Sequence, residues 1–275
     1  DGVAAVTLHS VLQPTFNPID GSIISMFDQA ADWVQENGYK GLVIASEATH
    51  FSAGANLALM LRAIDEKDWD GLDAMSKAMQ DTLQKLRFAP FPVVAAPHWM
   101  ALGGGYETIG ACDRIVSAAE LYTGLVEVGV GLIPGAGGNL RMIMKAQDRM
   151  AKGRAGAFQV VQKVFEAVGF AKISMSAKHA VSIGYLTKDD IIVVNGDHRV
   201  AKAKAEVLTM SEGYTAPALR TDLFLPGKGG RLAVKSSVKG FLKSGKISEH
   251  DALIAEKLAF VLTGGDKGGI MKPVD

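Results

Sequence analysis

Strand-like and helix-like segments alternate along the first half of the chain, and this alternation constrains the fold more than any other feature. Apolar residues recur at helical spacing over residues 23–34 and 72–86, which predicts two amphipathic helices. Short apolar runs before and after these helices are typical of buried strands: residues 3–8, 41–45, 93–96 and 114–116. This order predicts an α/β fold in which helices cover a sheet of short strands.

The second half is mostly helical by the same criterion. Helices are expected over 155–168, 176–183, 199–211 and 249–262. Ser248 and Asp251 have the spacing of a capping box at the start of the last helix. Residues 215–230 contain two prolines and several glycines, which indicates an irregular connection.

Composition excludes several classes of protein. With 48% hydrophobic residues and 29 Lys+Arg against 29 Asp+Glu, the chain is globular and not intrinsically disordered. The cations of the second half are scattered among acids, so we expect no nucleic-acid partner. No apolar run is long enough for a membrane span. The single cysteine, Cys112, cannot close an intrachain disulfide, which favours a reducing, cytoplasmic location.

Metal and cofactor motifs are missing. The six histidines include no i,i+4 pair, and no Gly-x-Ser-x-Gly nucleophile motif occurs. A near P-loop ending at Gly245-Lys246 has Ile247 in place of Ser or Thr, so we interpret it as a loop before the last helix. The run from Gly129 to Pro134 lacks the third glycine of the dinucleotide fingerprint. We therefore expect no metal ion and no cofactor in this chain.

Glycine-rich loops accompany two acidic residues. The loop 101–105 follows a predicted strand and precedes Glu107, and the loop 51–56 stands in the same relation to another strand. Bare N–H groups in such loops can stabilise an oxyanion. Glu127 comes just before a third glycine run, so the two carboxyl groups could act as base and acid. Glycine runs also serve tight turns and close packing, and that reading stays open at this point.

The same segments, in this order, resemble the crotonase (enoyl-CoA hydratase/isomerase) superfamily. The matching stretches are Phe51–Ala55, Pro92–Ala96, Ala101–Glu107, Cys112-Asp113 and Gly131–Gly138. The resemblance implies a spiral of ββα turns with a helical C-terminal region. It places the spiral core and the active site in residues 1–190 and a helical extension in residues 191–275.

The resemblance also implies a site that binds an acyl-CoA thioester. The N–H groups of Ala53 and Gly104 would hold the thioester carbonyl, Glu107 would activate water for attack on C3, and Glu127 would protonate C2. Because hydratases of the family use both acids, the pair favours hydration of a trans-2-enoyl-CoA in fatty acid β-oxidation. The N–H of Gly135 is expected to orient the water. The expected substrate contacts are Ser52, Gly54, Ala55, Asn56, Gly103, Pro134 and Gly135.

Departures from the common family pattern resemble one subgroup. Asn56 replaces a usual Asp, Ala58 a usual Lys and Thr123 a usual aromatic residue. Together with the tail 247–266, they are similar to the C-terminal domain of bacterial fused 3-hydroxyacyl-CoA dehydrogenase/enoyl-CoA hydratases. The start at Asp1 fits a piece cut from such a protein. We then expect NAD in an upstream dehydrogenase domain, contact with that domain, and a homo-oligomer, with a trimer as one option.

Two other functions remain open. The first is a Δ3,Δ2-enoyl-CoA isomerase, which needs one well-placed base. The second is a non-catalytic acyl-CoA-binding or docking module of the parent enzyme, since the positions near the CoA phosphates diverge.

Overall fold

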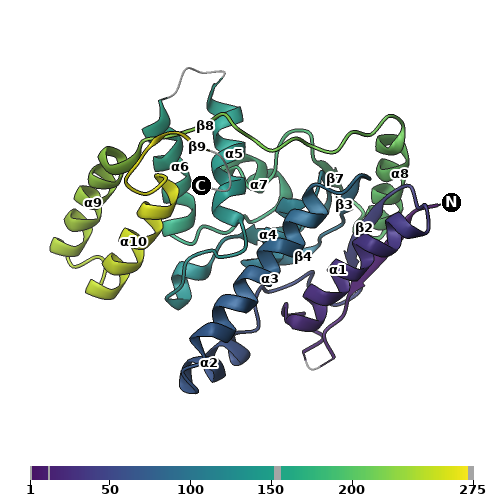
Figure 1. The fold of residues 1–275 in the computed structure, drawn as a ribbon, viewed down its shortest axis with the longest axis horizontal. Helices are drawn as coiled ribbons and strands as arrows, with labels where there is room; N and C mark the ends of the chain where they lie inside the picture. The colour runs from purple at the N-terminus through teal and green to yellow at the C-terminus, as the bar shows by residue number, and fades with distance from the viewer. Residues whose placement is uncertain (1, 12, 152–155, 272–275) are drawn as a thin grey trace. The chain divides into compact units, whose positions relative to one another are not determined.

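The computed structural model describes residues 2–11, 13–151 and 156–271, and this part of the chain forms two compact units (Figure 1). The first unit contains residues 1–123, 135–137 and 174–217. The second contains residues 124–134, 138–173 and 218–275. The chain therefore passes between the units several times, and each unit is built from segments that are distant in sequence.

Five parallel strands form the main sheet of the first unit, in the order β1-β2-β3-β5-β7. Val43 of β2 pairs with Ala5 on one side and with Val94 on the other. All five residues of β2 are buried, as expected for a parallel strand with both faces covered. The strands are β1 Ala4–Leu8, β2 Leu42–Ser46, β3 Val93–Ala95, β5 Arg114–Ala118 and β7 Ile191–Val193.

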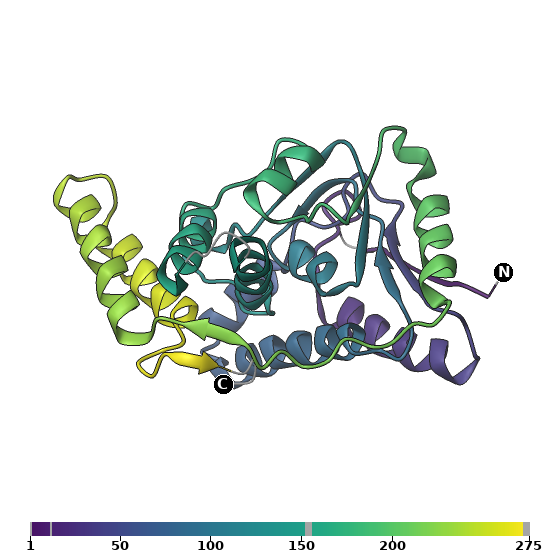
Figure 2. The ribbon, with the colours of Figure 1, turned by 90° about the horizontal axis from the view of Figure 1, so that it is seen from above.

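Helix α8 (Arg199–Ser211) lies along one face of this sheet (Figure 2). Its Ala203 and Val207 are fully buried against alternate residues of the strands, among them Val43 and Val94. Side chains alternate between the two faces of a strand, so every second residue of β2 and β3 meets this helix. The burial of these branched apolar residues stabilises the sheet beneath the loops described below.

The remaining elements of the first unit are helices and a second, smaller sheet. Helices α1 (Gly21–Glu36) and α3 (Trp69–Arg87) pack against each other, and Lys85 of α3 forms ion pairs with Asp28 and Asp32 of α1. A separate two-stranded sheet joins β4 to β6. The bounds are α2 Leu57–Asp65, β4 Trp99–Leu102, α4 Gly104–Ala111, β6 Leu121–Gly124, α7 Ala177–Ile183 and the 3-10 turn η2 Gly196–His198.

The second unit is mainly helical. A buried cluster that includes Val234, Val238, Ala252 and Ala259 joins α9 to α10. The Ser248–Asp251 capping box begins α10, which confirms the sequence prediction. The elements are the 3-10 turn η1 Glu127–Val130, α5 Gly138–Ala151, α6 Ala157–Gly169, β8 Leu223–Leu225, α9 Gly227–Lys243, α10 Glu249–Leu262 and β9 Gly269–Met271.

The predicted strands and helices of the first half are confirmed, but the second half needs corrections. Residues 215–230 are not irregular throughout, because β8 lies in this stretch and pairs with β9 near the C-terminal end, and α9 begins at Gly227. Gly240, the first residue of the near P-loop that we interpreted as a loop, lies inside α9. The glycines of this helix hid its apolar spacing from the sequence analysis.

The two compact units also differ from the predicted division at residue 190. Residues 191–217 belong to the first unit, because β7 pairs with β5 and α8 packs on the sheet. Residues 124–134 and 138–173 belong to the second unit. Among the described residues, no helix is long and apolar enough to cross a membrane.

Candidate active site

Main-chain hydrogen bonds join two glycine-containing segments of the first unit. We call residues 51–56 the first loop and residues 101–105, which form the end of β4 and the start of α4, the second loop. The Ser52 N–H donates to the Met100 carbonyl at 2.9 Å, and the Leu102 N–H donates to the Ser52 carbonyl at 3.0 Å. This pattern is a parallel β-bridge. The two glycine-rich loops singled out in the sequence therefore lie side by side.

Glycine is required where the two loops approach most closely. A Cβ at Gly105 would lie 2.7 Å from the Ser52 carbonyl oxygen. Gly54 has φ +100, and a Cβ there would lie 2.9 Å from the Leu102 carbonyl oxygen. Close packing of backbone, the alternative that the sequence left open, is thus one real role of these glycines.

Asn17 anchors the first loop to the rest of the unit. Its side chain is fully buried, and its Nδ2 donates to the carbonyls of Leu8 and Phe51, each at 3.1 Å. Its Oδ1 accepts from the Ser10 N–H at 2.7 Å. A buried amide with these bonds holds the loop start in one position.

The structure corrects one predicted oxyanion donor. The Ala53 N–H already donates to the Phe16 carbonyl at 2.8 Å. Ala55, two residues after Ala53, forms a parallel bridge with Ile19. In this bridge the Ile19 N–H donates to the Gly54 carbonyl, and the Asn56 N–H donates to the Ile19 carbonyl. In such a bridge the N–H of the bridged residue points away from its partner. Ala55, predicted only as a substrate contact, therefore has the available N–H.

Ala55 and Gly104 bring two N–H groups together. A Cβ built on Gly104 would lie 3.6 Å from the Ala55 nitrogen, and Ala55 is exposed. Gly104 begins α4, where the first N–H groups have no acceptor within the helix. Within the described residues neither N–H has a hydrogen-bond acceptor. Two neighbouring N–H groups at a helix N-terminus can hold a carbonyl oxygen or an oxyanion.

Glu107 lies in the first turn of α4 and is only 4% exposed. The Ala136 N–H donates to its Oε1 at 2.8 Å. Ala136 belongs to the third glycine-rich run, which the sequence placed near the acids. The predicted role of the neighbouring Gly135 N–H in orienting water stays a prediction.

Glu127 lies in the second unit, where it begins the 3-10 turn η1 and is half-buried. The Gly131 N–H donates to the Val128 carbonyl and the Leu132 N–H donates to the Glu127 carbonyl. These main-chain bonds close the turn. Pro134 is buried, and its carbonyl accepts from the Asn139 side chain at 2.9 Å. Its predicted contact with a substrate stays a prediction.

Other predicted residues have structural tasks inside the first unit. Ser52 is fully buried, and its hydroxyl accepts from the Gly54 N–H at 3.1 Å. Gly54 and Gly103 are also buried, and Gly103 has φ +52 at the N-cap of α4. Asn56 is the N-cap of α2. Of the predicted contacts in the first two loops, Ala55 is the exposed one.

His98 supports the first loop from the side of β4. Its Nε2 donates to the Ala48 carbonyl at 2.8 Å, and the side chain is buried. Burial disfavours the charged ring and lowers the pKa of His98 below its usual value, and the charges of Arg199 and His50 act in the same direction. A neutral His98 is therefore part of the support of this loop.

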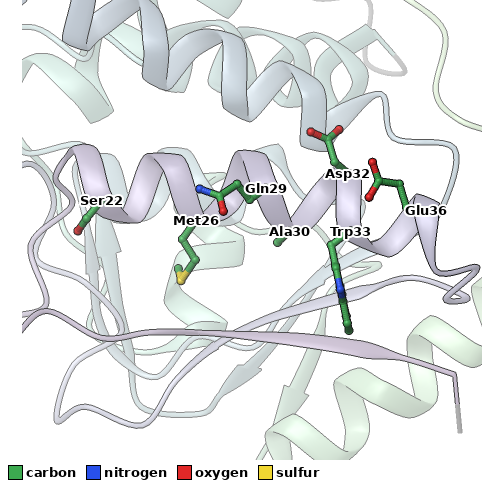
Figure 3. Close-up of a pocket in the computed structure, with 7 residues that line it drawn as sticks. All are labelled: Ser22, Met26, Gln29, Ala30, Asp32, Trp33 and Glu36. Atoms are coloured by element: carbon green, nitrogen blue, oxygen red, sulfur yellow. The ribbon is translucent and has the colours of Figure 1, made fainter.

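The described residues contain no group of three or more His, Cys, Asp or Glu arranged to hold a metal ion. An open hollow runs along α1, lined by polar and apolar side chains of that helix (Figure 3). Its lining residues are Ser22, Met26, Gln29, Ala30, Asp32, Trp33 and Glu36. None of them is a predicted site residue, so this hollow is not the candidate active site.

Sequence reasoning missed three residues around the loops. Asn17 and Gln80 gave no signal, because their hydrogen bonds reach residues far away in the sequence. Ala136 was adjacent to a predicted residue, but only the backbone geometry shows that its N–H donates to Glu107.

A model of the enoyl-CoA hydratase/isomerase family matches residues 1–157. A Bacillus subtilis protein named "Probable 3-hydroxyacyl-CoA dehydrogenase" is 37% identical over 265 residues, which is 96% of this chain and 32% of the relative. A "Fatty acid oxidation complex subunit alpha" of Vibrio campbellii is 39% identical over 109 residues, which is 38% of this chain and 15% of the relative. The chain thus spans about a third of the first relative and less of the second.

Solved structures share the fold. The crystal structure of an enoyl-CoA hydratase from Polaromonas sp. JS666 has a TM-score of 0.62 and 20% identity, and the match covers 94% of this chain and 87% of that one. At this identity the likeness is one of fold. It confirms the spiral α/β fold expected from the sequence motifs.

Proposed function

The chain belongs to the enoyl-CoA hydratase/isomerase family, and we propose that it adds water to a trans-2-enoyl-CoA and forms a 3-hydroxyacyl-CoA. This is the hydration step of fatty acid β-oxidation. The relative from a fatty acid oxidation complex supports that setting.

One arrangement in the first unit supports the proposal most. The N–H groups of Ala55 and Gly104 lie next to each other, and the buried carboxyl group of Glu107 follows Gly104 on the same short helix. The two N–H groups are suited to the thioester oxygen, on which negative charge develops when water attacks C3. The N-terminus of α4 adds a favourable partial positive charge.

Glu107 is suited to the role of general base. Its carboxylate accepts the Ala136 N–H at Oε1, which fixes the orientation of the group. As water attacks, its oxygen bonds to C3 of the acyl chain and one of its protons passes to the Glu107 carboxylate. The double-bond electrons move toward the thioester, and the resulting enolate oxygen is held by the two N–H groups.

Glu127 is proposed as the second acid on the strength of the family resemblance. It would give a proton to C2 as the enolate collapses, so that one H and one OH are added across the double bond. Glu127 is half-buried at the start of its turn, and its Oε2 is shielded from solvent.

The length of the curated relatives supports a proposal about the parent protein. This chain covers only 32% of the relative whose printed name is a 3-hydroxyacyl-CoA dehydrogenase. The product of hydration is a 3-hydroxyacyl-CoA. We therefore propose that an NAD-dependent dehydrogenase domain of the same protein oxidises the product made here.

A Δ3,Δ2-enoyl-CoA isomerase is the second candidate. The first unit alone provides one buried base and two N–H donors, which is the minimum that a proton shuttle between C4 and C2 requires. Hydration uses both carboxyl groups, whereas isomerisation can depend on one. A non-catalytic acyl-CoA-binding module would depend on neither.

The test follows the loss of enoyl thioester absorbance with short and long trans-2-enoyl-CoAs. The variants are Glu107→Gln, Glu127→Gln and, as a control, the exposed Glu36→Gln. We expect turnover by the wild type and by the control, and losses of about 10²- to 10⁴-fold in each of the other two variants.

Each alternative has its own outcome in this assay. If 3-enoyl-CoA isomerisation is fast and depends on one glutamate while hydration is absent, the isomerase assignment replaces ours. A folded protein that binds acyl-CoA, and whose full-length parent is unaffected by both glutamine substitutions, is a docking module.

A further inference from the structure

A single peptide group lies between two side chains of the first unit. Its carbonyl, from Gly135, accepts a hydrogen bond from Gln80 Nε2 at 2.5 Å. Its N–H, from Ala136, donates to Glu107 Oε1 at 2.8 Å. The C=O and N–H of a trans peptide point in opposite directions. Gln80 of α3 and Glu107 of α4 are therefore connected in series through one peptide plane.

The space beside the two glycines that flank Ala136 is open. A Cβ built on Gly135 or Gly137 would meet no atom within 4 Å, and Gly137 has φ +105. A glycine segment without packed side chains can rotate its peptide planes at little cost. The hydrogen bonds at the two ends of the peptide thus determine where the Ala136 N–H points.

Hydrogen bonds in series also strengthen one another. A donor on the carbonyl polarises the peptide and makes its N–H a better donor. That N–H faces a carboxylate that is only 4% exposed, and a buried carboxylate needs hydrogen-bond donors to remain charged. Gln80 therefore affects both the orientation and the stabilisation of the Glu107 carboxylate.

Charged side chains near α4 do not offer an alternative anchor. Lys77 pairs with Asp81 at 2.7 Å, and Lys85 pairs with acids of α1. Arg87 Nη1 lies 3.7 Å from Asp113 Oδ1. Strand β4, which also packs on α4, has no charged residue. On α3, the neutral amide of Gln80 is the group that reaches the glycine segment.

We propose that Gln80 is a positioning residue for the reaction: it holds the Gly135–Ala136 peptide so that the Ala136 N–H orients the catalytic carboxylate of Glu107. This inference rests on the proposed function, because it assigns Glu107 the role of base. Gln80 itself touches no reacting atom.

The test compares Gln80→Met with Gln80→Lys in the full 275-residue chain. Both replacements are unbranched, long and compatible with a helix, but only lysine keeps a hydrogen-bond donor. We expect kcat for hydration of a trans-2-enoyl-CoA to fall about 10-fold in Gln80→Met, with KM changed less than about twofold, since the lost contact acts in the transition state. Gln80→Lys should restore at least half of the wild-type kcat.

A second measurement needs no substrate. Hydrogen exchange of the Ala136 amide, followed by NMR, should be about 10-fold faster in Gln80→Met than in wild type, because the peptide is no longer held. Gln29→Met is the matched control, since Gln29 is an exposed helical glutamine whose Nε2 donates to Ser25 of the same helix. It should change neither kcat nor the Ala136 exchange rate.

The outcomes separate this inference from the proposed function. An unchanged kcat and unchanged exchange in Gln80→Met overturn the inference, as do equal losses in the Met and Lys variants. If wild type shows no hydration although it is folded, the proposed function fails. The Ala136 exchange rates then decide alone whether Gln80 holds the Glu107 contact.

Discussion

Glu107 and Glu127 are held in place by different means, although the same reaction is proposed for both. The segment before Glu107 is tied to a loop about fifty residues earlier by main-chain hydrogen bonds, and its carboxylate is bonded to Ala136. The turn that begins at Glu127 is closed by hydrogen bonds among its own neighbours. The main chain before Glu107 is thus tied to a distant loop, whereas the turn at Glu127 is closed by local bonds and contacts α10.

The surroundings of Glu107 and Glu127 should therefore differ in their tolerance to substitution. A base that is bonded on several sides moves little, so its geometry is set by the whole first unit. An acid in a short turn depends on the few residues around it. We expect changes in the paired loops to affect Glu107, and changes in the turn or in the segments that contact it to affect Glu127.

The largest expected effect is on catalysis by the two acids together. Glu107→Gln and Glu127→Gln should each lower kcat by about 10²- to 10⁴-fold. If both act in one transition state, the double variant should lose far less than the product of the two single losses. Steady-state hydration rates of the four proteins measure this. Fully multiplicative losses would contradict a shared step.

The next effect is expected in the paired loops. Gly105→Ala would place a Cβ 2.7 Å from the Ser52 carbonyl oxygen, and neither backbone can move without breaking the bridge. We expect unfolding free energy to fall by about 2–3 kcal/mol and the Leu102 amide to exchange faster. Urea denaturation and hydrogen exchange test this. A variant as stable as wild type would show that the loops can separate at no cost.

Gly124→Ala is the matched substitution in the second unit. Gly124 lies three residues before Glu127, and a Cβ added to it would lie 2.5 Å from the Lys172 carbonyl oxygen. We expect a loss of about 1–3 kcal/mol in stability and a lower kcat, while the Asn56 amide, which donates to the Ile19 carbonyl in the first loop, exchanges as in wild type. Faster exchange in the first unit would mean that the two acids are not held independently.

The smallest expected effect is a pH dependence confined to the Glu107 region. Burial lowers the pKa of His98 in the folded protein, so the unfolded chain binds more protons below the usual histidine pKa of about 6.5. Stability should therefore decrease as pH falls through that value. The urea midpoint should drop between pH 7.5 and 5.5 in wild type.

His98→Asn should reduce this drop, because asparagine keeps a donor for the Ala48 carbonyl but does not titrate in this range. An unchanged drop in His98→Asn would show that His98 does not carry the pH dependence.

Much of the first unit could be predicted from the sequence. The strands at 41–45 and 93–96 and the helices at 23–34 and 72–86 follow from hydrophobic spacing, which local residues carry. The two glycine loops were also recognisable, because runs of small residues between a strand and a helix are unusual. The α9 helix escaped detection, since glycines at both ends weaken its periodic signal.

The local sequence does not predict which of Ala53 and Ala55 has an available N–H. Both are alanines beside Gly54, and nothing local distinguishes their N–H groups. The pairing with Phe16 and Ile19 uses the Ala53 N–H and turns that of Ala55 outward. That pairing joins segments more than thirty residues apart, so no pattern within the loop reveals it.

The sequence alone therefore determined the fold class, the glycine loops and the two acidic residues, because these depend on residue type and spacing along the chain. Only the tertiary structure decided which N–H groups are available, that Ala136 bonds Glu107, and that Gln80 lies behind the same peptide. Hydrogen-bond partners are chosen by proximity in space and by the direction of each N–H and C=O. Neither is encoded in the spacing of residues along one segment.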